Sequence, residues 1–288
     1  MATMTNEQIL AAFKYNFNKK KEIRLINSFK GLPISFNATI LAIEGNNVTV
    51  KVDRSQIVCM YRDHETYIQG EAFQGSIKGH VTQLDLFKLE TILSYFEVPE
   101  VSFNDRAHIR VEPNNPISGN IKTKEARIPF RGILADISQG GLGIYIEERL
   151  FHPNIYRPGV EIIVEVSLPS LGKVGTRTTV QYEEIGKDER TDPQGSRINP
   201  FSDLLRPTTS LSSATYQLNA SGNVELHGTV VKTNRDQGSG RYRVGIKLAA
   251  NDINRSVIHQ FVNIRQAEII NEIRAEYLTV ISSLQKPK

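Results

Sequence analysis

The sequence predicts a mainly β protein, with a small split-barrel-like domain, a second small β-barrel in tandem, and a C-terminal α-helix. Short apolar runs that alternate with polar residues occur in both halves of the chain, and turn-forming residues separate them. A polar junction, Pro99–Asp105, lies between the two halves. From Asp252 onward the apolar spacing becomes helical. Together these three observations give two β-rich domains and a terminal helix.

A helix and a hairpin open the first domain. Apolar residues at helical spacing predict an amphipathic helix within Glu7–Leu25. Alternation from Ile34 to Ala42, the turn residues Gly45-Asn46-Asn47, and a second alternating run over Val48–Val52 predict a β-hairpin.

The rest of the first domain is expected to close a small antiparallel barrel. Three further strands are predicted at Gln56–Tyr61, Glu65–Ile68 and Ser76–Leu84, and Asp85–Phe96 has the spacing of a helix. Cys59 falls in the first of these runs, where a thiol is expected to act as a small apolar group.

The second half of the chain again alternates. The expected strands are Ile128–Ile137, Leu142–Ile146, Val160–Leu168, Val224–Thr233 and Tyr242–Leu248. We therefore expect a first domain over residues 1–100 and a second over 101–288. The second would contain an arginine-bearing linker (101–115), a polar insertion (186–223) and a C-terminal helix (252–284), which is expected to pack on the barrel but is also compatible with a homodimer.

Composition narrows the class of protein. The chain has 288 residues, a formal net charge of +4 and a single cysteine. It therefore forms no internal disulfide and no cysteine-built zinc site, and this charge alone does not favour nucleic-acid binding. No segment approaches the roughly 20 apolar residues that a membrane-spanning helix needs, and no signal peptide is evident, so we expect a cytoplasmic protein.

Motifs of common enzymes are missing from the sequence. The six histidines lack metal-ligand spacing, and there is neither a Gly-x-Ser-x-Gly elbow nor a glycine-rich phosphate loop ending in Lys-Ser/Thr. The sequence therefore predicts a protein that is not an enzyme, has no catalytic residues, and uses neither a metal nor a cofactor.

Two short arrays carry the candidate chemistry. The first is Arg106-Ala107-His108-Ile109-Arg110, and the second is Asp136-Ile137-Ser138-Gln139-Gly140-Gly141. A guanidinium is planar and permanently charged, so Arg106 and Arg110 can bind a phosphate or the O6/N7 edge of guanine. Asp136 can accept hydrogen bonds from the N1–H and N2–H groups of guanine, and Ser138 can donate or accept. Gly141 allows either a backbone conformation or a close approach that a Cβ would block.

Each array is weakly specific by itself. Arg127 and Arg131 repeat the arginine spacing, and an Asp-x-Ser-x-x-Gly string often makes an ordinary turn. Without Asp136 and Ser138 downstream, Arg106 and Arg110 would be interpreted as surface arginines in exposed ion pairs worth about 0–1 kcal/mol each. The two arrays in this order, with a β-rich segment between them, favour a ligand site.

Together the arrays resemble the signature of PilZ domains, bacterial receptors for cyclic di-GMP (c-di-GMP). The stretch from Pro158-Gly159 to Leu168-Pro169, and the run Arg243-Val244-Gly245-Ile246-Lys247-Leu248, are also similar to that family, so the resemblance spans about Arg106 to Ile270. It implies that c-di-GMP binds to five residues: Arg106, Arg110, Asp136, Ser138 and Gly141.

The first hundred residues resemble, more loosely, the N-terminal barrel of YcgR-like flagellar-brake proteins, chiefly through Leu32-Pro33-Ile34 and the hairpin that follows. This resemblance implies that ligand binding reorients the barrels and regulates a protein partner, such as the flagellar motor or the exopolysaccharide machinery. Recruitment to the flagellar basal body would follow from a motor partner.

Three further positions are secondary site candidates. Asp105 precedes the first arginine, and its negative charge could weaken phosphate binding. Gly140 belongs to the predicted turn, and Gly143 either lines the cleft or, as we favour, serves the hairpin. Asp105 or the insertion could disable the site, which leaves open an interaction module that no longer binds the nucleotide. A nucleic-acid-binding barrel would need interleaved aromatic and basic side chains on one sheet face, and none is evident.

Overall fold

The structure is a computed structural model. It describes residues 4–99, 108–123, 130–169, 222–236, 238–250 and 252–285. The chain divides into two compact units, Met1–Ser167 with Val224–Lys288, and Leu168–Asn223. The second unit is described only at its ends. The predicted domain boundary at residues 100 and 101, and residues 186–221 of the predicted insertion, lie outside the described residues.

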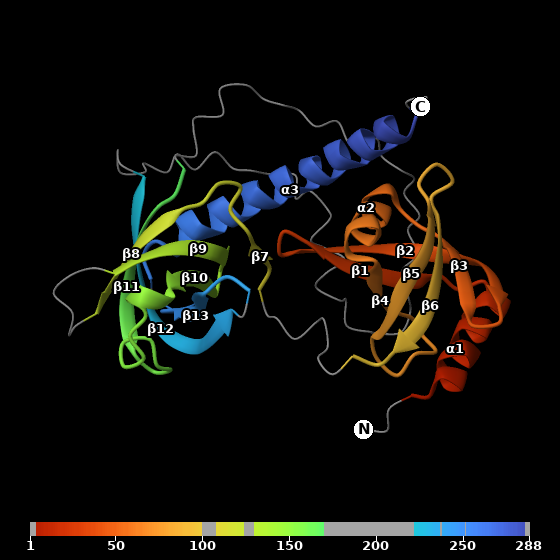
Figure 1. Cartoon of the computed structure of the whole chain (residues 1–288), viewed down its shortest axis with the longest axis horizontal. Coiled ribbons are helices and arrows are strands. Elements are labelled where there is room, and N and C mark those ends of the chain that lie inside the picture. Colours follow the sequence, from red (N-terminus) through yellow and green to blue (C-terminus); the bar gives the residue numbers. More distant parts are fainter. Residues whose placement is uncertain are drawn as a thin grey trace, which may run out of the picture. The chain divides into compact units, whose positions relative to one another are not determined.

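The first barrel is formed by six antiparallel strands in the order β1-β2-β3-β6-β5-β4, and pairing of β1 with β4 closes it (Figure 1). Its elements are α1 (Asn6–Asn18), β1 (Ile23–Phe29), β2 (Leu32–Glu44), β3 (Asn47–Lys51), α2 (Arg54–Asp63), β4 (Glu65–Gln69), β5 (Ile77–Asp85) and β6 (Glu90–Glu97).

The hairpin predicted in this barrel is confirmed. β2 and β3 pair in antiparallel register, with Glu44 opposite Asn47, and Gly45 between them has a φ of 58°. A positive φ is accessible to glycine without a steric cost, which explains the turn at this position. The helix predicted within Glu7–Leu25 is also present, although it ends at Asn18 because the chain enters β1 at Ile23.

Two predicted elements of the first barrel are wrong. The run Gln56–Tyr61 is helical and belongs to α2, where the Asp53 side chain caps the helix by accepting from the Ser55 amide at 2.7 Å. The helix predicted for Asp85–Phe96 is instead a turn followed by β6, because Asp85 Oδ1 accepts from the amides of Phe87 and Lys88. In both cases a local side-chain hydrogen bond sets the backbone conformation.

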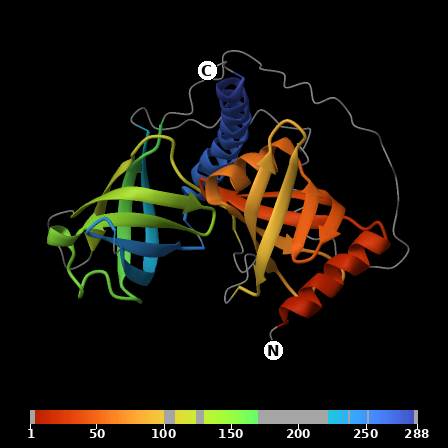
Figure 2. The same cartoon turned by 45° about the vertical axis from the view of Figure 1, so that its right-hand side comes forward.

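The second barrel also closes, in the order β10-β13-β12-β11-β8-β9 with β9 pairing back to β10, and the short β7 adds to β9. Figure 2 shows this barrel and α3 from a second direction. The elements are β7 (Arg110–Val111), β8 (Ser118–Thr123), β9 (Phe130–Ser138), β10 (Gly141–Glu147), the 3₁₀ turn η1 (Glu148–Leu150), β11 (Glu161–Ser167), β12 (Asn223–Asp236), β13 (Arg241–Leu248) and α3 (Arg255–Leu284). The predicted fold class, two β-barrels in tandem with a C-terminal helix, is confirmed.

The C-terminal helix α3 is held by a buried arginine in its first half. Arg265 is 2% exposed and donates from Nε to the Glu112 carbonyl at 2.8 Å and from Nη1 to Glu272 Oε1 at 2.6 Å. This hydrogen bond lowers the pKa of the Glu272 carboxyl, which also pairs with Lys30 at 2.6 Å.

Among the described residues, none of the helices combines the length and apolarity needed to cross a bilayer.

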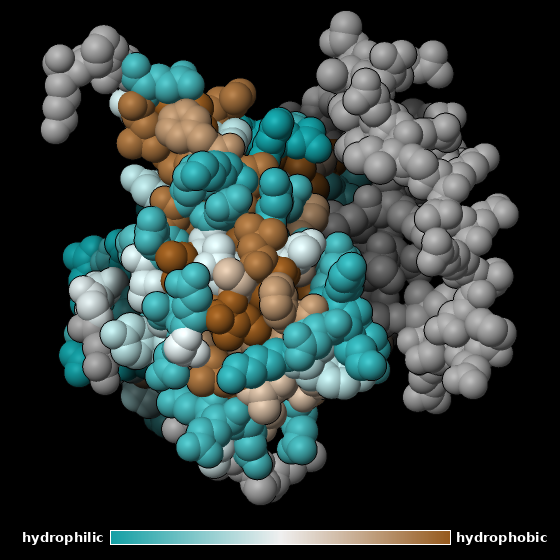
Figure 3. Space-filling view, turned by 90° about the vertical axis from the view of Figure 1, so that its right-hand side faces the viewer, coloured by the Kyte–Doolittle hydropathy of each residue, from teal (hydrophilic) through white to brown (hydrophobic). Residues whose placement is uncertain are grey.

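The core of the first barrel includes a cluster of phenylalanines. Phe13 of α1 is fully buried, with its ring centroid 5.0 Å from that of Phe73 and 4.8 Å from that of Phe96. Phe17, on the same helix, is 40% exposed. Figure 3 shows the face of the molecule that lies on the right-hand side of Figure 1, where hydrophobic residues lie among polar ones.

Replacing Phe13 with alanine should therefore lower the free energy of unfolding of the first barrel by about 3–5 kcal/mol, because the change leaves a cavity in a packed core. Urea titration followed by circular dichroism measures the change. The matched control is Phe17→Ala on the same helix, which should shift the free energy by less than about 0.5 kcal/mol. Equal effects of the two substitutions would contradict this packing of α1.

Candidate functional site

The second predicted array lies on the hairpin formed by β9 and β10. Asp136 and Ser138 are on β9, Gly141 begins β10, and the register places Gly141 opposite Ser138 and Gly143 opposite Asp136. Ser138 is 3% exposed, and its hydroxyl donates to the Gly141 carbonyl at 3.0 Å. The hydroxyl therefore closes the turn from the inside and holds the hairpin in shape.

Gly141 allows two strands to approach each other closely. A Cβ at this position would overlap with the carbonyl oxygen of Ile246 on the paired strand β13. Gly141 is not among the residues with a positive φ. Space, and not backbone conformation, therefore requires glycine here, and the close approach expected from the sequence is made to β13.

The first array meets the hairpin through β7. Arg110 pairs with Ser138 in the register of β7 and β9, so its backbone lies directly beside the second array. Arg110 Nη1 is 3.7 Å from Asp136 Oδ1, with the arginine side chain 39% exposed and the aspartate side chain 7% exposed. The structure therefore brings one predicted arginine and the predicted aspartate together.

The other predicted members of the first array cannot be placed. Arg106 and its neighbour Asp105 lie outside the described residues, as does Arg127 of the second arginine pair. Arg131, the second residue of that pair, lies exposed on β9 opposite Asn120.

Sequence reasoning missed Arg243. This residue lies on β13 opposite Tyr145 of β10, and its Nη2 donates to Asp136 Oδ2. The guanidinium crosses β10 over Gly143, where a Cβ would be 3.1 Å from Asp136 Oδ2 and 3.3 Å from Arg243 Nε. Gly143 thus leaves the space in which the carboxylate and the guanidinium meet, in addition to its place in the hairpin. Asp136 and Arg243 carry opposite charges, and this is the signal that the sequence contains. Only the order of the strands in the sheet shows that the two residues lie close together.

Two further side chains contact the turn between β9 and β10. A Cβ on Gly140 would overlap with the His108 imidazole, so this ring lies over the turn. Arg255, the first residue of α3, donates from Nε to the Gln139 carbonyl at 3.4 Å. From its place between the two arginines, the sequence favours an outward-pointing His108 over one that touches ligand, and it gives no sign of Arg255.

Three guanidiniums and an imidazole therefore surround one buried carboxylate and its turn. Such an arrangement can bind a phosphate through the arginines and a donor-bearing base edge through Asp136. Among the described residues, no group of three or more His, Cys, Asp or Glu side chains could hold a metal ion.

Cys59 is buried in α2, and burial raises the pKa of its thiol to about 12. The thiol therefore stays protonated near neutral pH and lacks the thiolate character of a nucleophile. Its interpretation as a small apolar group is confirmed, although in a helix and not in the predicted strand.

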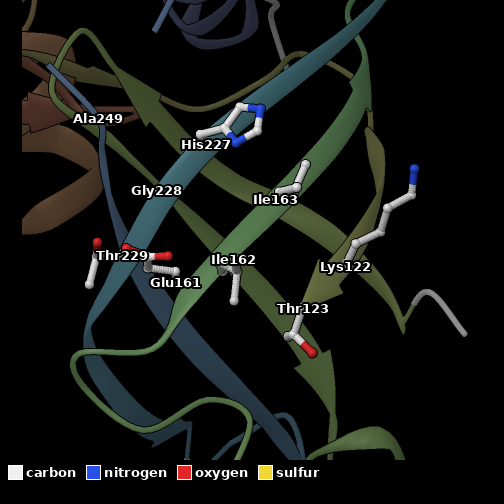
Figure 4. Close-up of a pocket in the computed structure, with 9 residues that line it drawn as sticks. All are labelled: Lys122, Thr123, Glu161, Ile162, Ile163, His227, Gly228, Thr229 and Ala249. Atoms are coloured by element: carbon white, nitrogen blue, oxygen red, sulfur yellow. The ribbon is translucent and has the colours of Figure 1, made fainter. Parts of the chain in front are cut away.

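A cavity of about 230 Å³ opens on other strands of the second barrel (Figure 4). None of the predicted site residues lines it, so it does not coincide with the two arrays. Its lining comes from β8, β11, β12 and the residue after β13: Lys122, Thr123, Glu161, Ile162, Ile163, His227, Gly228, Thr229 and Ala249.

Comparisons with known proteins find similarity only among solved structures. No family model matches the chain, and no curated protein matches it. A structure of K. pneumonia MrkH in complex with c-di-GMP matches at 10% identity, covering 94% of this chain and 99% of that one, with a TM-score of 0.40. The Bacillus subtilis inhibitor of motility, MotI/DgrA, matches at 15% identity over 86% of this chain and 96% of that one, with a TM-score of 0.35.

A third match is the PilZ domain of Escherichia coli YcgR with c-di-GMP, at 13% identity over 60% of this chain and 97% of that one, with a TM-score of 0.32. These structures are of the kind that the motif resemblance predicts. At TM-scores of 0.40 or lower they carry no argument about this chain. The functional argument therefore rests on its own residues.

The close approach at Gly141 leads to a prediction about stability. Gly141→Ala should lower the free energy of unfolding of the second barrel by roughly 1–3 kcal/mol, because the methyl group forces β10 away from the Ile246 carbonyl. Thermal unfolding followed by circular dichroism measures the loss. Gly245→Ala on β13 is the matched control, since a Cβ there would meet its nearest atom at 3.6 Å, an ordinary contact distance. A stability loss as large for Gly245→Ala would refute the steric explanation.

Proposed function

We propose that the protein is a c-di-GMP receptor whose ligand state regulates a protein partner. The observation that carries the proposal is the position of the Arg110 guanidinium, 3.7 Å from the buried Asp136 carboxylate, on a strand that pairs with the Asp136 hairpin. A cation and an acceptor at this separation suit a ligand that combines phosphates with a guanine edge.

Each part of the site has a distinct task in this proposal. Arg106 and Arg110 bind a phosphate and the O6/N7 edge of guanine, and Asp136 accepts from the N1–H and N2–H groups of the base. Ser138 and Gly141 keep the hairpin in the shape that presents Asp136, which is supported by the hydroxyl-to-carbonyl bond and by the close approach to Ile246.

Contacts of α3 with the turn of the second array and with the segment just after the first array support a route from the ligand to a partner. Arg255 binds the carbonyl of Gln139 in the turn, and Arg265 binds the carbonyl of Glu112, two residues after Arg110. A ligand that reorders either segment changes the contacts of α3, and it shifts the conformational equilibrium only by its differential affinity for the two states.

The resemblance of the first hundred residues to flagellar-brake proteins favours the flagellar motor as the partner. A cytoplasmic location with recruitment to the basal body is part of the proposal.

Isothermal titration calorimetry of the full chain with c-di-GMP tests the receptor function. Binding should be saturable, and Arg110→Ala or Asp136→Asn should weaken it by about 10- to 100-fold, because each removes a charge-assisted contact worth roughly 1.5–3 kcal/mol. Arg131→Ala is the control, since this arginine is exposed on β9 and has the spacing, but not the position, of a site residue.

Equal weakening by all three substitutions would reject the assignment of Arg110. Absence of binding by the wild-type protein, together with capture of the same protein partner with and without c-di-GMP, would favour the interaction module that does not bind the nucleotide.

A further inference from the structure

The inference concerns Arg243, and it rests on the proposed function. Asp136 is 5% exposed, and its Oδ2 accepts from Arg243 Nη2. Among the residues that the structure describes, Oδ1 has no hydrogen-bond partner, although Arg110 lies 3.7 Å away. A buried carboxylate needs compensation for its lost hydration, and here a guanidinium from another strand supplies most of it.

A Cβ at residue 143 would crowd the path that Arg243 takes to Asp136. A Cβ on Gly143 would be 3.1 and 3.2 Å from the two carboxylate oxygens and 3.3 Å from Arg243 Nε. Gly143 does not have a positive φ, so the backbone gives no separate reason for a glycine. The ion pair is thus built into the outer surface of three adjacent strands, β9, β10 and β13.

A guanidinium and the Watson–Crick edge of guanine are similar in hydrogen-bonding chemistry. Each presents adjacent N–H donors in one plane, and each suits a carboxylate that accepts two parallel hydrogen bonds. Only 7% of the Asp136 side chain is exposed, so its carboxylate has little room for two such partners. A guanine that binds Asp136 must therefore take the position of the Arg243 guanidinium.

We infer that Arg243 is an internal competitor for the guanine base and that it sets the ligand concentration at which the site fills. The apparent dissociation constant rises in inverse proportion to the fraction of molecules in which Asp136 is accessible. Nucleotides that cannot replace the Arg243 donor at the Asp136 carboxylate, such as those with an adenine edge, are excluded by the same competition.

The test changes Arg243 to glutamine. This substitution keeps much of the side-chain length and removes both the positive charge and the adjacent coplanar N–H donors of the guanidinium. Calorimetric titration of the full chain with c-di-GMP should show binding by Arg243→Gln that is about 5- to 10-fold tighter than binding by the wild type. The matched control is Arg241→Gln, two residues earlier on β13 opposite Glu147, which should leave the affinity within about twofold. A purely structural role of Arg243 would not tighten binding.

The outcomes separate the competition from the receptor function. Tighter binding by Arg243→Gln supports the competition, and heat from this variant with none from the wild type would support it as well. Binding by both proteins, with Arg243→Gln equal to or weaker than the wild type, overturns the competition and leaves the receptor function in place. Heat from neither, with both proteins folded by circular dichroism, overturns both.

Discussion

The candidate site depends on one buried carboxylate. Burial of the Asp136 carboxylate in the outer wall of a closed barrel is compensated by guanidiniums from β13 and β7 that lie beside it. Gly143 leaves the space for this contact, Ser138 holds the turn, and Gly141 lets β10 approach β13. These features serve the placement of a single acceptor. In the proposed function a ligand must bring its own donors, since a ligand without them cannot replace the Arg243 guanidinium at the carboxylate.

The barrel architecture could be predicted from the sequence because strand alternation and turn residues are local signals. The hairpin of β2 and β3 follows from Gly45-Asn46-Asn47, and β9 to β13 lie close to their predicted ranges. The failures at Gln56–Tyr61 and Asp85–Phe96 have a shared cause, because one aspartate side chain bonded to nearby amides decides each conformation. An apolar run in a covered helix has the same composition as a buried strand, so periodicity alone does not separate them.

The site was predictable only in part, for a different reason. Asp136, Ser138 and Gly141 lie within six residues of one another, so their spacing is visible in the chain. Arg243 lies 107 residues beyond Asp136 and reaches it only because β10 separates β9 from β13 in the sheet. His108 and Arg255 likewise depend on where β7 and α3 lie. A sequence pattern records which residues are near in the chain, and it does not record the order in which strands lie across a barrel.

The length of β7 has a consequence for how the site can change. This strand contributes two residues, Arg110 and Val111, and it pairs with the end of β9 that β8 leaves free. The barrel closes through β9 and β10 whether or not β7 is attached. The anchorage of β7 comes from its C-terminal side, where Val111 is fully buried and the Glu112 carbonyl accepts from the buried Arg265. Movement of the arginine-bearing strand is therefore tied to α3, because Arg110 lies two residues before the carbonyl that Arg265 holds.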